Sequence, residues 1–230
     1  MDNMYEILMS LPLLNGASRQ RILEIAGKTK FHFLKYTDGE TVVSVGDPCT
    51  HIKFLLSGAV RSSINTSDGR FSIAQTLTAP SVIAPEFLFG KSPFYPATVV
   101  SVGSSGFLQI AKADYLSMLM TDQVFTFNFL NMLSSSSQKL IEGMLTVTNG
   151  AIEERIAYWI AALTQRDGTN IVMSCRHRDL CATFGVPRSS LNAALETLRT
   201  RGLIEYNNTA IRVVSRTELL KLLQTPEEEM

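Results

Sequence analysis

The chain has 230 residues, of which 45% are apolar and 18% are charged, and its 21 basic side chains balance 21 acidic ones. This length suits one large or two ordinary domains, each able to bury a substantial core. The longest apolar run, residues 156–163, is far shorter than the ~20 residues of a membrane span, and the acidic start predicts no signal peptide. The three cysteines form no CxxC pair, so we expect a cytoplasmic protein with no membrane partner.

Residues 1–27 are predicted to form short helices, and residues 31–111 short strands separated by turn residues. We expect breaks at Ser57-Gly58 and over 103–106, and Asp68-Gly69 between two strand-like runs predicts a hairpin. Regular short strands of this kind are typical of an all-β sandwich or barrel.

Helical patterns return over residues 112–166. Within them, apolar or small residues recur at spacings of 3, 4, 3, 4 and 3, which predicts a helix that pairs with a second copy of itself. A helix packed on its own barrel would give a similar stripe, so both interpretations stay open. The seam consists of Leu130, Leu133, Ser137, Leu140, Met144 and Val147. A turn at residues 149–150 precedes another helix, expected over 152–165.

The last 60 residues predict a winged helix-turn-helix. Helices over 176–184 and 188–201 flank a tight turn, and Pro187 suits the first turn of the second helix. Strands over 203–206 and 210–214 would form the wing around Asn207-Asn208, because asparagine tolerates the positive φ angles of a two-residue turn. If the second helix enters the major groove, its polar start can reach base edges. The residues concerned are Arg188, Ser189 and Asn192.

Charge is consistent with this interpretation. Residues 170–221 carry eight basic side chains against four acidic ones, although the whole chain is neutral. Seven of the eight are arginines, which suit bidentate contacts with phosphates and guanine edges.

The whole order of elements resembles the CRP/FNR superfamily of bacterial transcription regulators. The motifs that carry the resemblance are Tyr36 to Glu40, Gly46-Asp47, Phe54 to Arg61, Asp68-Gly69, Arg155-Ile156-Ala157 and Asp179 to Leu191. The resemblance implies an α+β fold with an N-terminal cyclic-nucleotide-binding-like β-roll (1–114), a long dimerisation helix (115–148) and a C-terminal winged helix-turn-helix (149–230). It also implies a homodimer that binds double-stranded DNA at a pseudo-palindromic operator, with RNA polymerase as a further candidate partner.

The same resemblance suggests roles for individual DNA-facing residues. Arg188 matches the arginine with which the family commonly reads bases, whereas Ser189 and Ala193 replace a glutamate and an arginine that often follow. The operator sequence best known for the family is therefore not assumed. The residues His177, Arg178 and Ser190 lie where phosphate contacts are expected.

The resemblance also bears on the effector. Members that bind cyclic nucleotides hold the phosphate with a Gly-Glu loop and an arginine, but this chain has Ala84-Pro85 and Tyr95 at these places. Proline lacks an N–H donor, and without the arginine the main countercharge is lost. Leu140 and Ile141 stand where hydroxyl residues would face an adenine ring, so we expect an effector other than cyclic AMP. The candidate pocket consists of Phe87, Leu88, Phe89, Tyr95, Leu140 and Ile141.

The cofactor stays unassigned at this point. Three scattered cysteines exclude a four-cysteine iron–sulfur cluster, and no metal site is predicted. Residues 84–89 with Pro96 are similar to regulators of hybrid-cluster-protein genes, a subgroup in which haem has been implicated as the nitric oxide receptor. A haem-based sensor of nitrosative stress is therefore one alternative. Its candidate axial ligands are His32, Cys49, His51 and Tyr95.

Two further function classes are alternatives to a DNA-binding regulator. An enzyme on a cupin-like β-roll is rejected, because the three histidines offer no paired metal ligands and no catalytic grouping is recognisable. A ligand-binding regulatory subunit that uses its winged helix for protein contact stays as the second alternative. Steep salt dependence of DNA binding would speak against it.

Overall fold

The computed structural model describes residues 6, 8, 9 and 11–223, and these fall into two compact units. The first unit comprises Met1–Ser62 and Leu77–Ser136, and the second comprises Ser63–Thr76 and Ser137–Met230, within the described residues. This division differs from the expected boundaries at 114 and 148. The reason is that a hairpin of the N-terminal half, Ser63–Thr76, groups with the C-terminal half.

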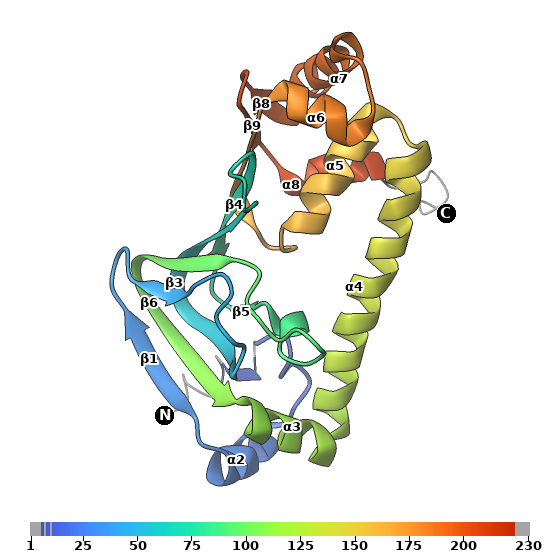
Figure 1. Ribbon diagram of the computed structural model, residues 1–230. Helices are drawn as coiled ribbons and strands as arrows, with labels where there is room; N and C mark the ends of the chain where they lie inside the picture. Colours follow the sequence, from blue (N-terminus) through green and yellow to red (C-terminus); the bar gives the residue numbers. More distant parts are fainter. Residues whose placement is uncertain (1–5, 7, 10, 224–230) are drawn as a thin grey trace. The chain divides into compact units, whose positions relative to one another are not determined.

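The first unit is an antiparallel β-roll closed by helices (Figure 1). Its strands are β1 (His32–Tyr36), β2 (Thr41–Val43), most of β3 (His51–Asn65), β5 (Ser81–Ile83) and β6 (Thr98–Ala111). Strand β6 pairs with β1 and β2, and β3 pairs with β5. The helical segments are α2 (Arg19–Lys28), the 3-10 helix η1 (Pro85–Phe87), α3 (Lys112–Thr121) and the first half of α4 (Gln123–Asn149). Their buried faces form one apolar core with the strands.

Two expected strand breaks are wrong, because glycine lets the strands continue. Strand β3 passes through Gly58, which has φ +81°, and a Cβ atom there would overlap the backbone of Ser104 on β6. Strand β6 likewise runs through Gly103 at φ +70°. A residue without a side chain accommodates the positive φ and the close approach of the backbones. The expected hairpin at Asp68-Gly69 is confirmed, since it joins β3 to β4 (Phe71–Thr78).

The strands of the second unit continue the same nine-stranded sheet, in the order β4-β7-β9-β8. The remaining strands are β7 (Thr169–Cys175), β8 (Ile204–Tyr206) and β9 (Ala210–Val213). The helical segments are α5 (Ile152–Leu163), α6 (His177–Phe184), α7 (Arg188–Thr200), α8 (Arg216–Leu220) and the 3-10 helix η2 (Lys221–Leu223). The three helices expected in this region are confirmed, with ends shifted by one or two residues.

Strand β4 lies between β3 and β7 in the sheet, and the sequence did not predict its pairing with β7. It runs antiparallel to β7, with Phe71 opposite Cys175 and Ile73 opposite Met173. The side chains of Phe71 and Ile73 are buried in the second core. The ring of Phe71 stacks on Trp159 of α5 with a centroid distance of 4.6 Å. The hairpin is therefore an integral part of the second unit.

Helix α4 carries the predicted dimer seam, but only some of the seam residues are exposed. Leu130, Ser137 and Met144 are exposed, whereas Leu133 packs against the core of the first unit. The side chains of Leu140 and Val147 lie outside the described residues. The exposed positions at spacings of 3, 4, 3, 4 and 3 are instead Phe127, Leu130, Ser134, Ser137, Ile141 and Met144. None of the helices in the described residues has the length and apolar character to cross a membrane.

Candidate nucleic-acid interface and effector site

The helix-turn-helix consists of α6, a three-residue turn and α7. Helix α6 ends at Gly185, whose φ of 63° lies in the left-handed region that glycine adopts without strain. The N–H of Val186 donates to the carbonyl of Cys181, which closes the turn. Pro187 is the N-cap of α7. The expectation that it belongs to the first turn of this helix is therefore wrong by one position. The carbonyl of Pro187 accepts the first helical hydrogen bond, from the N–H of Leu191.

Helix α7 has one buried and one exposed face. The buried face anchors the helix through residues at helical spacing, namely Leu191, Ala194, Leu195 and Leu198. The predicted base-reading residues Arg188, Ser189 and Asn192 are all exposed at its start, and Ser190 is half-buried. The helix therefore presents a polar, solvent-facing N-terminal turn from a rigid base, as a recognition helix requires.

The wing is built from β8 and β9, but its turn differs from the predicted type. Neither Asn207 nor Asn208 has a positive φ, so the turn is not the mirror-image type expected. The side chain of Asn207 instead accepts hydrogen bonds from the N–H groups of Thr209 and Ala210, both at 2.9 Å. This turn is therefore held by an asparagine side chain that bonds the backbone ahead of it.

Side chains also join the wing to both helices. The imidazole of His177 is only 7% exposed, and its Nε2 lies 2.9 Å from the carbonyl oxygen of Asn207. The hydroxyl of Tyr206 donates to Glu196 of α7, and Glu196 also binds Arg199. His177 therefore holds the wing turn and does not present its ring to a phosphate, whereas Arg178 is exposed beside it.

The loop at the start of η1 is the expected phosphate-binding place of the β-roll. Ala84 has φ 42° and precedes Pro85, which has no N–H. The N–H groups of Phe87 and Leu88 donate to the carbonyls of Ala84 and Pro85. Glu86 is exposed and places a carboxyl group at the same loop. Pro85, Phe87 and Leu88 thus hold no N–H free for a ligand phosphate.

The expected countercharge is replaced by a neutral group. Tyr95 is buried, and its hydroxyl donates to the carbonyl of His51 at 3.1 Å. Burial raises the pKa of this phenol, so it carries no charge near neutral pH.

The four candidate haem ligands differ in their exposure and in their hydrogen bonds. Tyr95 is committed to His51, while the Nδ1 atom of His51 lies 2.9 Å from the hydroxyl of Thr50. His32 is exposed on β1, and Cys49 is buried in the first core. Among the described residues, no three His, Cys, Asp or Glu side chains gather as metal ligands would. A haem-based sensor therefore stays a prediction for this chain.

An aromatic cluster lies behind η1 within the first unit. Phe89 packs edge-on against Phe129 of α4, and Phe129 packs edge-on against Tyr115 of α3. The ammonium of Lys112 lies 5.3 Å from the centre of the Phe89 ring. The hydroxyl of Tyr115 is fully buried and has no hydrogen-bond partner among the residues that the structure describes. Tyr115 could not be predicted from the sequence, because no sequence pattern indicates an unsatisfied hydroxyl.

The expected effector pocket is therefore described only in part. Leu88 is buried and Phe87 and Phe89 are half-buried in the first unit, next to Phe129 and Tyr115. Leu140 and Ile141 belong to the half of α4 that groups with the second unit. Ile141 is exposed, and the side chain of Leu140 lies outside the described residues. Their place beside the aromatic loop stays a prediction.

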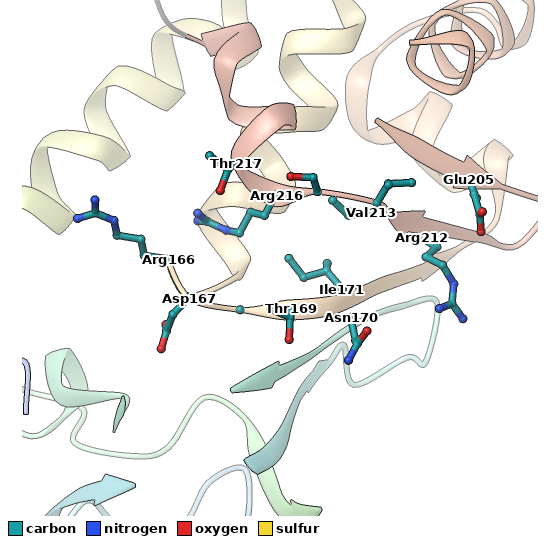
Figure 2. A pocket seen from close by; sticks show the side chains of 13 residues that line it. Arg166, Asp167, Thr169, Asn170, Ile171, Glu205, Arg212, Val213, Arg216 and Thr217 are labelled. Atoms are coloured by element: carbon teal, nitrogen blue, oxygen red, sulfur yellow. The ribbon is translucent and has the colours of Figure 1, made fainter. Parts of the chain in front are cut away.

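A polar cleft of about 600 Å³ lies elsewhere, in the second unit, between residues 166–171 and 212–217 (Figure 2). Its best-anchored side chain is Arg216, whose guanidinium donates to the hydroxyl and carbonyl of Thr164 and to the carbonyl of Ala161. These bonds satisfy the C-terminal carbonyls of α5. Arg216 therefore has a structural role at the base of the cleft.

Comparison with known families covers both halves of the chain. The cyclic nucleotide-binding domain family matches residues 33–122, and the Crp-like helix-turn-helix domain family matches residues 154–222. The order and content of these two domains decide the family. The chain belongs to the CRP/FNR superfamily of transcription regulators. The α+β fold expected for that superfamily is confirmed.

Individual relatives of this CRP/FNR regulator are distant. The cyclic AMP receptor protein of Thermus thermophilus is 24% identical over 210 residues, which is 88% of this chain and 92% of the relative. The structure of the catabolite activator protein from Thermus thermophilus has a TM-score of 0.52 at 19% identity, covering 92% of this chain and 98% of that one. The sensor domain of the regulator DNR from Pseudomonas aeruginosa has a TM-score of 0.54 at 22% identity, covering 61% and 92%. These structures support the fold.

Proposed function

We propose that this CRP/FNR regulator is a homodimer that reads a pseudo-palindromic operator with α7 and responds to an effector other than a cyclic nucleotide. The observation that carries the DNA-binding role is the polar start of α7. Arg188, Ser189 and Asn192 are exposed there, while the opposite face is locked in the core by residues such as Leu195. This arrangement suits insertion into the major groove, where arginine pairs with guanine and asparagine with adenine.

The phosphate contacts are assigned to the start of α6. Arg178 is exposed there, together with Arg176, and Ser190 is the corresponding half-buried residue on α7. His177 contributes by holding the wing turn through Asn207 and so has a positioning role. Its expected direct phosphate contact is not retained.

The dimer is assigned to the exposed stripe of α4. The large apolar residues Phe127, Leu130, Ile141 and Met144 face solvent in a single chain. Exposed apolar residues that recur at heptad spacing form a surface that a second copy of the same helix can cover. Two α4 helices side by side would give the two recognition helices that a pseudo-palindromic operator requires.

The effector is proposed to carry no phosphate that binds at η1. Pro85 lacks an N–H, the N–H groups of Phe87 and Leu88 are already bonded, and Glu86 adds a carboxyl group at the same place. Tyr95 supplies no positive charge to offset an anion. The neighbouring aromatic cluster instead suits a compact, largely apolar effector, and its identity is left open.

The recognition helix is tested by substituting Arg188 with alanine. The operator is first obtained by selecting duplexes from a randomised pool with the wild-type protein. Loss of one bidentate base contact is expected to reduce discrimination by about 1–3 kcal/mol per half-site, which is roughly 5- to 150-fold. The matched control is Arg201→Ala, which removes an exposed arginine at the other end of the same helix. Unchanged operator discrimination by Arg188→Ala would show that α7 is not the base-reading element.

A further inference from the structure

The hairpin that joins β3 to β4 lies beside the predicted phosphate-binding end of α6. Antiparallel pairing sets Phe71 opposite Cys175, the last residue of β7. Continuing this register by one residue on each strand places Arg70 of the hairpin opposite Arg176, the N-cap of α6. All of these residues belong to the second unit.

Electrostatics supports this closeness. Asp179 of α6 contributes to raising the pKa of Arg70, after the larger effect of Asp68 within the hairpin. Asp179 also binds Arg176 and Arg178, at 3.1 Å and 3.4 Å. The hairpin tip and the start of α6 thus form one cluster of three arginines, Arg70, Arg176 and Arg178, which pair with the carboxylates of Asp68 and Asp179.

The guanidinium of Arg70 is available to a further partner. Its side chain is 60% exposed, and its Nε donates to Asp68 at 2.6 Å. Among the described residues, the terminal nitrogens of Arg70 make no hydrogen bond. A guanidinium held at Nε by one carboxylate keeps these nitrogens for a second acceptor, and phosphate oxygens match their geometry.

The docking geometry of a helix-turn-helix places that acceptor. When the second helix enters the major groove, the first helix crosses the sugar-phosphate backbone. The cluster at the start of α6 then faces a run of phosphates. Since Arg70 extends this cluster along the strand direction, its guanidinium faces the same run of phosphates.

We propose that the tip of the hairpin between β3 and β4 is part of the DNA interface, and that Arg70 binds a backbone phosphate next to those bound at the start of α6. This inference rests on the proposed DNA-binding function. It assigns a direct DNA contact to a residue that lies in the sequence within the cyclic nucleotide-binding domain, residues 33–122. Such a contact would make operator affinity depend on how this hairpin is held in each subunit.

The test compares Arg70→Gln with the full-length wild type on the duplex that the wild type selects. Affinity is measured by fluorescence anisotropy over a series of KCl concentrations. Each lost phosphate contact lowers the slope of log affinity against log salt by about 0.9, so a dimer should lose about 1.8. The ratio of the wild-type DNA affinity to that of Arg70→Gln should then be about 12-fold larger at about 50 mM salt than at about 200 mM.

Two controls separate the phosphate contact from other effects. Arg166→Gln removes an exposed arginine of the same unit that precedes the opposite end of β7, and its slope should equal that of the wild type. Arg70→Lys keeps the charge and should keep most of the slope. The fluorescence of Trp159, which stacks on Phe71 next to the substitution, should be unchanged if the hairpin stays docked.

The outcomes distinguish this inference from the proposed function. If the wild type selects no duplex and binds DNA without salt dependence, the proposed function fails. If the wild type binds with a steep slope and Arg70→Gln has the same slope, only the assignment of Arg70 is overturned. An equal loss of slope in Arg166→Gln would also overturn it, because the effect would then reflect net charge.

Discussion

Replacing Phe71 with alanine removes the aromatic ring through which the hairpin packs on the second unit. Phe71 is 9% exposed, so nearly its whole side chain leaves water on folding. Burial of a phenylalanine contributes about 1.5–3 kcal/mol, and stacking on a second aromatic ring adds about 0.5–1.5 kcal/mol. We therefore expect the free energy of unfolding of the second unit to fall by about 3 kcal/mol, close to the lower end of buried phenylalanine-to-alanine substitutions.

The assay uses Trp159, the single tryptophan of the chain, as a local probe. It stacks on Phe71 and packs edge-on against Phe184, so its fluorescence reports the second unit. Urea unfolding of the full-length protein, followed at this tryptophan, gives the free energy of unfolding for each variant. The matched control is Phe33→Ala, because Phe33 lies on β1 and is 51% exposed. If Phe71→Ala costs less than about 1 kcal/mol, as expected for an exposed residue, the hairpin is not part of the second core.

Three further predictions concern other parts of the chain. Tyr115→Phe removes a buried hydroxyl without a partner, so thermal unfolding should show unchanged or higher stability, and a loss of about 1 kcal/mol or more would reveal a hidden hydrogen bond. Ile141→Glu places a charge on the exposed stripe of α4 and should give a monomer by light scattering, whereas an unchanged dimer mass would refute the stripe. Burial raises the pKa of the Cys49 and Cys175 thiols, so they hold less thiolate near pH 8 than a free cysteine. Alkylation at pH 8, mapped by mass spectrometry, should therefore be slower at both than in the urea-unfolded chain, and should accelerate toward the raised pKa; equal native and unfolded rates would contradict their burial.

The second unit illustrates what local sequence patterns can predict. The helices α6 and α7 have strong end signals in Gly185 and Pro187, and the apolar spacing along α7 identifies its buried face. Each of these features depends on residues within one or two helical turns. The start of α7 could therefore be identified as an exposed polar surface from the sequence alone.

Features that depend on distant residues could not be predicted in this way. The pairing of Phe71 with Cys175 joins residues about a hundred positions apart, and neither strand contains a signal for its partner. The burial of His177 follows from its contact with Asn207 in the wing, which the helix pattern does not include. Gly58 predicts a strand break because glycine usually interrupts strands, whereas in the structure it relieves a close approach to Ser104.

The seam on α4 shows an intermediate case. The apolar residues of this helix repeat in two overlapping phases, one through Leu133 and the other through Phe127 and Ile141. Spacing alone does not distinguish them, because both satisfy a heptad pattern. The packing of Leu133 on the first core leaves the second phase exposed, and tertiary contacts therefore decide which face can meet a partner.

Selection of duplexes from a randomised pool by the full-length protein tests the central claim most directly. A dimer that reads DNA with two copies of α7 should enrich inverted half-sites whose centres lie about one helical turn, or about 10 base pairs, apart. The enriched duplex should bind more tightly than random DNA, with an affinity that falls steeply with salt. A pool that remains random after repeated rounds would contradict the claim and would favour a regulator whose winged helix contacts protein.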